Sequence, residues 1–330
     1  MPFNVGGQAV IEGVMMRSAD RVSTAVRRIN GSILVKSEEY KPFVKRHLRF
    51  DIPIIRGAIA FFEMLLLGIK TLNFSAEVAA RDADEAMPGK PRKLKSDSGG
   101  LFSFSLILTA IVAMGVGVLI FFFVPIALTS LLKGNDGAFA FNIIAGIIRM
   151  AMFVLYIYII SKFKEIKRIF SYHGAEHKSI YAYEAGQELT PENVRIYSTK
   201  HPRCGTSFIL IVALLAILTY SISDTIFALI ANRAPYLLER FIVHFSLLPL
   251  VAGGSYELLK LSAKKVDNPL TALLVKPGLW LQMITTQEPD DGMLEVAICA
   301  LTHSLGGDYP GCVVYDGELK SVRIPNESVR

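Results

Sequence analysis

Long uncharged stretches dominate the pattern of hydrophobic and polar positions. Residues 101–132 contain no Asp, Glu, Lys or Arg, and the stretches 141–162, 205–231 and 237–258 are nearly as apolar. A helix that crosses the hydrocarbon core of a bilayer needs about 20 mainly apolar residues. The pattern therefore predicts a mainly α-helical membrane protein with four transmembrane helices, in a membrane domain that covers residues 101–262.

A fifth apolar stretch, residues 52–72, has a different pattern. Its charged residues Arg56, Glu63 and Lys70 recur every seven positions, which places them on one face of a helix, and most of the other positions are apolar. This pattern favours an amphipathic helix that lies in the membrane interface over a further crossing. We assign this interfacial helix to residues 51–80.

The remaining segments are more polar. Two stretches rich in strand-forming residues, 22–29 and 32–40, flank Asn30-Gly31, a pair typical of hairpin turns, so residues 1–50 are expected to form a small β-rich element. Residues 81–100 are predicted to be a flexible basic linker. The C-terminal segment, 263–330, has a helical pattern at 293–302, and its last 25 residues suggest a loop or a marginal strand pair.

Composition and charge set the orientation. The chain is 52% hydrophobic and 19% charged, with a mean hydropathy of +0.42, which excludes a disordered chain and an ordinary soluble enzyme. Lys and Arg number 16 in residues 1–100 and seven in the loop 163–204, against one in each of the loops 133–140 and 232–236. The positive-inside rule then places both termini and the 163–204 loop in the cytoplasm.

The same topology predicts the partners and the state of the cysteines. A net charge of +6 suits contact with the anionic lipid headgroups of the bilayer and requires no nucleic acid. All three cysteines (Cys204, Cys299 and Cys312) fall in segments that are predicted to be cytoplasmic. Reduced thiols are therefore expected, with no disulfide framework.

The candidate chemistry lies in the 163–204 loop, in the segment His173-Gly-Ala-Glu-His177. On a helix, His173, Glu176 and His177 share one face. Two imidazoles four residues apart can hold one divalent ion, and a neighbouring carboxylate can deprotonate water. The order H-x-x-E-H is that of the inverted zincins. The sequence thus predicts a zinc site, with His173 and His177 as ligands and Glu176 as the catalytic base.

The third zinc ligand stays open. A catalytic zinc keeps three protein ligands and a water, and His and Cys are its usual ligands. Two candidates, His201 and Cys204, precede the third predicted span, and Glu257 lies near the cytoplasmic end of the fourth. All three would then be near the cytoplasmic membrane surface, where the His173 helix can meet them if it folds back along that surface.

Four motifs in order give the chain a family resemblance: Gly6–Arg17, His173–Lys178, His201–Thr206, and Pro277–Gln282 with Thr285–Asp291. Together they resemble the YqhQ-like family of bacterial multi-pass membrane proteins, over nearly the whole chain. The resemblance implies a location in the bacterial cytoplasmic membrane. It also implies a metal-dependent activity at the same His and Glu residues, but no substrate.

These observations lead to alternative functions. The first is a metal-dependent hydrolase at the cytoplasmic membrane interface, which acts on a lipid or a peptide. The second is a non-enzymatic membrane scaffold or transport component, a homo-oligomer in which the His/Glu/Cys cluster is structural. A transporter is suggested by Arg149 and His244, which lie within predicted spans where ionisable groups are costly.

Overall fold

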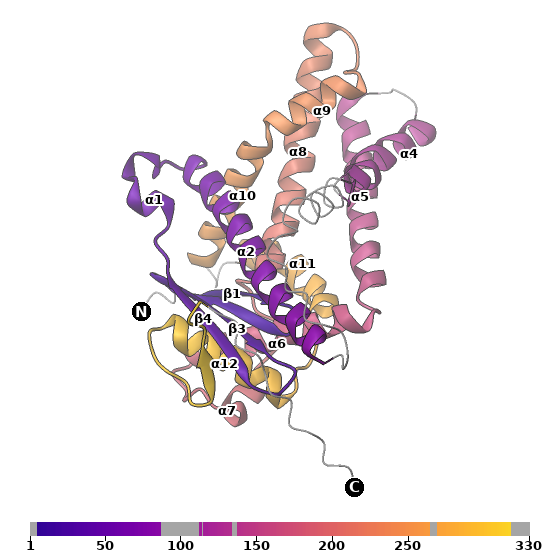
Figure 1. Ribbon diagram of the computed structural model, residues 1–330. Helices are drawn as coiled ribbons and strands as arrows, with labels where there is room; N and C mark the ends of the chain where they lie inside the picture. The colour runs from indigo at the N-terminus through magenta and orange to yellow at the C-terminus, as the bar shows by residue number, and fades with distance from the viewer. Residues whose placement is uncertain (1–4, 87–111, 114, 134–136, 265–268, 318–330) are drawn as a thin grey trace, which may run out of the picture. The chain divides into compact units, whose positions relative to one another are not determined.

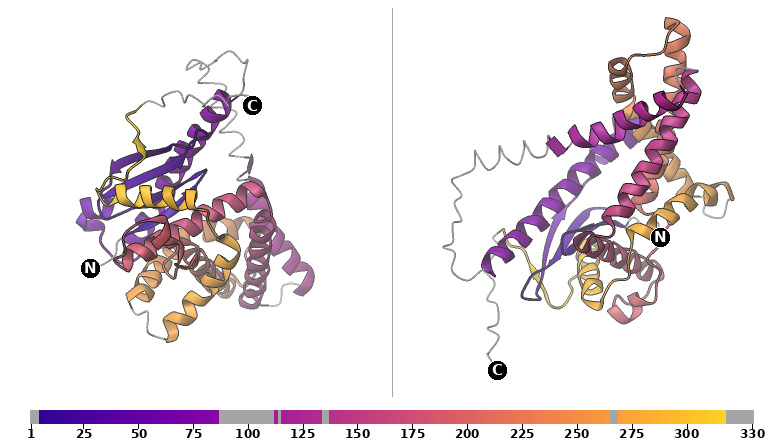
Figure 2. Two further views of the ribbon diagram at one scale, coloured as in Figure 1. Left: turned by 90° about the horizontal axis from the view of Figure 1, so that it is seen from below. Right: turned by 90° about the vertical axis from the view of Figure 1, so that its right-hand side faces the viewer.

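The computed structural model describes residues 5–86, 112–113, 115–133, 137–264 and 269–317 (Figures 1 and 2). Its internal contacts divide the chain into two compact units. The first, here called the sheet unit, combines Met1–Pro88, Tyr158–Ile211 and Ala252–Arg330, and the second, the helical unit, combines Gly89–Ile157 and Val212–Val251. Segments that the sequence pattern separates, the N-terminal element, the 163–204 loop and the C-terminal segment, thus contribute to one unit.

A five-stranded sheet forms the centre of the sheet unit. Its strands are β1 (Gly6–Val10), β2 (Gly13–Arg17), β3 (Arg21–Arg27), β4 (Ile33–Glu39) and β5 (Cys312–Val314). They lie in the order β1-β2-β3-β4-β5, antiparallel except for β5, which is parallel to β4. Gly31, at a φ of +87°, provides the turn between β3 and β4. The predicted N-terminal β element is confirmed, but its edge strand comes from the C-terminal segment, where we expected a loop or a separate strand pair.

Helices cover both faces of this sheet. Helix α2 (Ile55–Glu85) packs on one face, and α6 (Lys164–Glu184) and α12 (Asp291–Ser304) pack on the other; Figure 2 shows α12 lying across the strands. In β2, Val14 and Met16 belong to the core under α6 and α12, whereas Met15 belongs to the core under α2. Because both faces are buried, this strand is apolar at consecutive positions instead of alternating.

Helix α2 confirms the predicted amphipathic pattern. Its three regularly spaced charges are all paired: Arg56 binds both carboxylate oxygens of Glu257 at 2.6 Å, Glu63 accepts the N–H of Phe43, and Lys70 donates to Glu38. The helix continues to Glu85, so the first five residues of the predicted linker are helical. Residues 87–100 of that linker lie outside the described residues.

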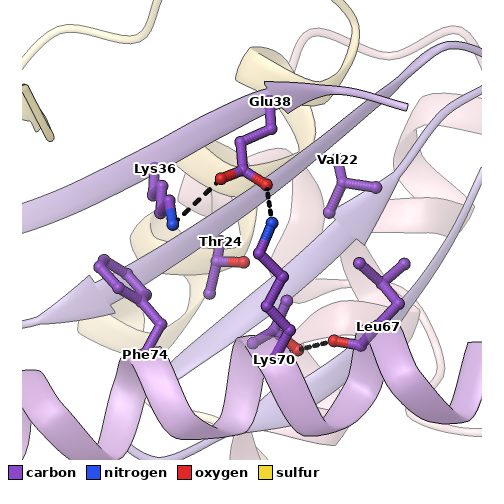
Figure 3. Close-up of a pocket in the computed structure, with 8 residues that line it drawn as sticks. Val22, Thr24, Lys36, Glu38, Leu67, Lys70 and Phe74 are labelled. Atoms are coloured by element: carbon purple, nitrogen blue, oxygen red, sulfur yellow. Dashed lines mark hydrogen bonds and ion pairs between the residues drawn. The ribbon is translucent and has the colours of Figure 1, made fainter. Parts of the chain in front are cut away.

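A pocket lies where α2 crosses the sheet. Figure 3 shows Glu38 of β4 between the ammonium groups of Lys36, on the same strand, and Lys70, on α2, with Phe74 at one side. The two ion pairs measure 3.0 and 2.5 Å. The ion pair between Lys70 and Glu38 therefore holds α2 to the sheet in addition to the apolar contacts.

Further helices of the sheet unit are α1 (Phe43–Arg46), the 3₁₀ turn η1 (Leu48–Phe50), α7 (Pro191–Arg195) and α11 (Pro269–Thr285). As its sequence suggests, Thr190 caps α7 by accepting the N–H of Asn193. Gly186, at a φ of +69°, ends α6.

Apolar helices dominate the rest of the chain. The π-helical turn η2 (Leu119–Phe123), α4 (Val124–Lys133), α5 (Ala138–Ile160), α8 (Gly205–Ala231), α9 (Leu237–Ser246) and α10 (Leu248–Lys264) follow in order. Among the described residues, three helical stretches are long and apolar enough to cross a membrane: Gly115–Leu132, Phe139–Ile160 and Phe208–Ala231. Such helices are typical of a membrane protein. Residues 101–111 of the first predicted span lie outside the described residues.

The fourth predicted span, 237–258, is not one straight helix. It corresponds to Leu237–Ser246 and Leu248–Leu261, which are bent by 45°, so the total is three candidate spans, or up to four if the bent pair crosses as one. Pro249 lies in the first turn of α10, where its missing N–H needs no acceptor. The proline favours the start of a new helix at this point, which explains the break.

Ionisable side chains of the helical unit are mostly paired with one another. His244 Nε2 lies 2.9 Å and Arg240 Nε 3.1 Å from the carboxylate of Asp224, and all three side chains are buried. Arg149 donates to the carbonyl of Phe121 at 2.7 Å. These contacts satisfy polar groups that would otherwise be costly in an apolar environment.

Candidate metal centre

Helix α6 places the predicted histidines against the chain that follows α11. The helix begins after Phe163 and is a separate helix from α5, which ends at Ile160. A Cβ added at Gly174 would lie 2.1 Å from the carbonyl oxygen of Gln287. Only glycine allows this close approach, which brings residues 285–287 alongside the histidines.

Both histidines of the motif have their Nδ1 atoms engaged by backbone carbonyls. His173 Nδ1 donates to Thr285 O at 2.8 Å, and His177 Nδ1 donates to Thr199 O at 2.5 Å. A carbonyl can only accept, so each neutral ring carries its proton on Nδ1 and has a lone pair on Nε2. Such outer contacts are typical of histidines that ligate a metal through Nε2.

Cys204 completes a compact group of donor atoms with these two histidines. Its Sγ lies 3.2 Å from His173 Nε2, and one donor atom each of His173, His177 and Cys204 lies within 4.8 Å of the other two. Bond lengths of about 2.0–2.1 Å to nitrogen and 2.3 Å to sulfur would separate two tetrahedral zinc ligands by about 3.5 Å. Burial lowers the pKa of His177, which favours the neutral ring that a metal requires. The donor set therefore fits zinc.

Glu176 is buried beside this group, under strand β1. Its carboxylate accepts the backbone N–H of Gly7, and its side chain is almost fully enclosed. Burial raises the pKa of Glu176, and the smaller opposing effects of His173, His201 and the Gly7 N–H do not cancel this rise. A carboxyl group with a raised pKa is suited to general acid–base chemistry near neutral pH.

His201 lies near the group but in a different role. Its backbone is held by Gln282, which accepts the His201 N–H at 2.7 Å and donates to its carbonyl at 2.9 Å. Its Nδ1 accepts the N–H of Arg203, so the neutral ring carries its proton on Nε2, 3.6 Å from a carboxylate oxygen of Glu184. Burial lowers the pKa of His201 to about 4. The Nε2 atom of this buried ring has no hydrogen-bond partner among the described residues.

Glu257 is not brought to this group. Both of its carboxylate oxygens are occupied by the guanidinium of Arg56, at 2.6 Å each. This bidentate pair engages both carboxylate oxygens of Glu257, whereas Cys204 lies beside the two histidines. The sequence pattern could place Glu257 near one end of a span but could not show that Arg56, 201 positions earlier, binds it.

Several residues that support the centre were not singled out by their chemistry. The carbonyls of Thr199 and Thr285, the amide of Gln282 and the N–H of Gly7 all act on site residues. Backbone groups carry no side-chain signal. Gln282 could have been noticed, because it is an uncharged polar residue inside an apolar run and is fully buried.

The cysteines of the C-terminal segment correct another expectation. Cys299 of α12 and Cys312 of β5 are joined by a disulfide, whereas we expected reduced thiols throughout. The expectation was wrong for this pair because it rested on the predicted compartment and could not foresee that β5 returns to the sheet beside α12. Cys204 is the one cysteine outside the bond.

The candidate centre lies in a part of the sequence that this chain has in common with known proteins. The family described as "Protein of unknown function (DUF1385)" matches residues 52–306, a range that includes α6 and Cys204. The chain belongs to the DUF1385 family. The uncharacterized protein YqhQ of Bacillus subtilis strain 168 is 37% identical over 302 residues, which cover 90% of this chain and 91% of that protein.

These findings confirm the resemblance to the YqhQ-like family. No solved structure matches the chain. Neither the description of the family nor that of the relative names an activity.

Proposed function

We propose that this DUF1385 protein is a metal-dependent hydrolase of the bacterial cytoplasmic membrane, with a zinc ion held by His173, His177 and Cys204 and with Glu176 as the general base. One observation carries this proposal. The two Nδ1 atoms are bound to backbone carbonyls, so the Nε2 lone pairs are left for a ligand beside the Cys204 thiol. Two imidazoles and one thiolate are a ligand set that zinc prefers, and three protein ligands leave a position for water.

At the proposed centre, the zinc ion, Glu176 and Gly7 would have separate roles. A bound zinc supplies a Lewis acid and lowers the pKa of a coordinated water. Glu176 takes a proton from the attacking water as the water oxygen bonds to an acyl carbon. It returns that proton to the alcohol or amine that leaves as the acyl bond breaks. The N–H of Gly7 orients the Glu176 carboxylate.

The neighbouring helices suggest the substrate class. Cys204 directly precedes α8, which contains the candidate span Phe208–Ala231. A ligand so near the end of a span suits a substrate that reaches the centre from the bilayer or from its cytoplasmic surface. We therefore expect an ester or amide of a lipid, or a membrane-bound peptide.

Metal analysis of the full-length protein in lipid nanodiscs tests the ligand set. With the Cys299–Cys312 disulfide intact, we expect about one zinc ion per chain, its loss in His173→Ala, His177→Ala and Cys204→Ala, and its retention in the control His47→Ala, because His47 is exposed and far from α6 in sequence. Retention of zinc at the parent level in the His173→Ala/His177→Ala double variant would refute the ligand set.

Glu176→Gln separates chemistry from metal binding. We expect this variant to keep its zinc and to lose hydrolysis of fluorogenic lipid esters or quenched peptides by at least about 100-fold, as is typical for removal of a general base. Glu165→Gln is the matched control, because Glu165 is an exposed carboxylate in the first turn of the same helix. Equal activity of the Glu176→Gln variant and the parent would overturn the catalytic role.

The second candidate function is a structural zinc site in a membrane scaffold. Burial favours it, because His177 and Cys204 are 1% and 8% exposed. A structural zinc has four protein ligands and no open position. X-ray absorption spectra of the zinc protein distinguish the two: a coordinated water supports the hydrolase, and a fourth protein ligand supports the scaffold.

The bilayer is the proposed partner of α2 as well. The charged face of this helix is paired within the sheet unit, while Leu65, Leu66 and Ile69 are about half exposed or more. Such an unpaired apolar face is typical of an interfacial helix. A fluorophore on Leu66→Cys should be quenched by lipid-attached quenchers, and one on Ile196→Cys, another exposed position, should not; equal quenching of the two would contradict this placement.

A further inference from the structure

A second group of donor atoms is formed by Cys299, His303 and Cys312, none of which belongs to the first group. One donor atom of each residue lies within 4.8 Å of the others. Cys299 and His303 are four residues apart on α12 and therefore share a helix face, and both are buried. Cys312 is the first residue of β5, so the group joins the last helix of the sheet unit to its last strand.

Backbone structure holds these residues together independently of the disulfide. Strand β5 pairs with β4, with Cys312 opposite Ile33, and the N–H of Tyr315 donates to the carbonyl of Val35 at 2.8 Å. The loop before β5 turns back through Gly306 and Gly311, both with a φ above +80°. The two sulfur atoms should therefore remain neighbours when the bond between them is broken.

The surroundings of His303 suit a metal ligand. Its Nδ1 lies 3.8 Å from Cys299 Sγ and 3.0 Å from the carbonyl oxygen of Cys299, and the carboxylate of Asp308 lies 3.2 Å from its Nε2. On zinc binding, the ring would carry its proton on Nε2, beside the Asp308 carboxylate, and would present the Nδ1 lone pair to the metal instead of donating from Nδ1 to the Cys299 carbonyl, an arrangement found around many zinc-bound histidines. Two thiolates on one zinc are about 3.8 Å apart, which the Cα–Cα distance of 6.7 Å allows.

We infer that, in the reduced protein, Cys299, Cys312 and His303 bind a zinc ion, with Asp308 as the residue that orients His303. The disulfide and the zinc-bound dithiol are then two forms of one structural link between α12 and β5. A reducing compartment would favour the zinc-bound dithiol, and an oxidising one the disulfide that the structure shows. This second zinc site is independent of the proposed hydrolase centre.

Two molecules of a thiol reductant of the glutathione class give two electrons and two protons to the disulfide and become a disulfide themselves. Cys299 and Cys312 become thiols. Binding of Zn²⁺ then releases one proton from each thiol, and His303 binds as a neutral ring.

The test uses the full chain in detergent with His173→Ala and His177→Ala, so that the first centre does not contribute. After treatment with reduced glutathione and equilibration with zinc alone, we expect one zinc ion per chain at this site, and none in the oxidised protein. Cys312→Ser and His303→Asn should abolish this binding, and Asp308→Asn should weaken it about 10- to 100-fold. His303→Cys should retain zinc, and the exposed-histidine control His47→Asn should behave as the parent.

Cobalt provides a second readout in the same His173→Ala/His177→Ala chain. Co²⁺ bound by two thiolates gives a strong sulfur-to-metal absorption band, which should appear in the reduced form of this chain and be absent from its oxidised form. The inference is overturned if a thiol count shows both cysteines free while neither zinc nor cobalt binds. It is equally overturned if His303→Asn, with unchanged circular dichroism, binds zinc as tightly as the parent.

Discussion

Gly6 and Gly7 are neighbours in β1, yet their surroundings differ completely. A Cβ added at Gly7 would lie 2.6 Å from Met15 O and 3.0 Å from the carboxyl carbon of Glu176, whereas at Gly6 no described atom lies within 4 Å. The need for glycine is therefore explained at Gly7, the second residue of the pair. The strand must approach Glu176 closely enough for the Gly7 N–H to donate to its carboxylate.

We predict that Gly7→Ala destabilises the protein by about 1–3 kcal/mol, since the added methyl group must displace a backbone carbonyl or Glu176. The melting temperature in detergent should fall by several degrees, at about 2–4 °C per kcal/mol. Gly6→Ala is the matched control and should change it by less than about 2 °C. Equal shifts in the two variants would contradict the close approach of β1 to Glu176.

The part of the centre whose residues are close together in the sequence could be predicted. His173, Glu176 and His177 share a helix face by spacing alone, and α6 confirms that helix. Cys204 could be proposed as one of several ligands but not chosen, because the choice depends on contacts across distant segments. Arg56 engages both carboxylate oxygens of Glu257, and the Arg203 N–H decides the tautomer of His201.

Helix α2 and strand β4 are joined through one carboxylate. Glu38 lies between Lys36 and Lys70 (Figure 3), and the pKa of Glu38 is lowered overall: burial raises it, but the hydrogen bonds and charges of the two lysines lower it more. A lowered pKa in the folded state means that the ionised group stabilises the fold above its unfolded pKa. That stabilisation is lost as the pH falls through the folded pKa.

We therefore predict that Glu38→Gln lowers the melting temperature at pH 7, by an amount that corresponds to less than about 1 kcal/mol because the pair is partly exposed. The difference from the parent should shrink below pH 5 and vanish once Glu38 is protonated. Melting curves from pH 7 to pH 3 measure this. Glu39→Gln, at the exposed end of the same strand, is the control. A difference that stays constant with pH would contradict the charge pairing.

Other elements show which patterns can be read from sequence. The hairpin at Asn30-Gly31 and the helix α12 follow from local patterns and are confirmed. Strand β5 could not be foreseen, because its three residues are held by pairing with β4, which is distant in sequence. The end of α2 at Glu85 was missed because Asp and Glu residues near a basic Pro-Gly stretch suggested a linker.

At the scale of the whole molecule, the chain order constrains the topology. The sheet unit is built from Met1–Pro88, Tyr158–Ile211 and Ala252–Arg330, which alternate with the two stretches of the helical unit. We predict that the sheet unit folds on one side of the bilayer, because the positive-inside rule places its basic segments in the cytoplasm. Each intervening stretch would then cross the bilayer an even number of times. That topology corresponds to four crossings, with the bent pair α9–α10 as one of them.

Reporter fusions to the full-length or truncated chain test that count. We predict that green fluorescent protein fluoresces when fused after Gln187 or after Arg330, because both sites should be cytoplasmic. Alkaline phosphatase should be active when fused after Asn232, between α8 and α9, because one crossing by α8 carries that site outward. With three crossings instead of four, the bent pair would not return the chain, and the fusion after Arg330 would be active as phosphatase and dark as fluorescent protein. The fusion after Gln187 is the internal control, since its side does not depend on α9–α10.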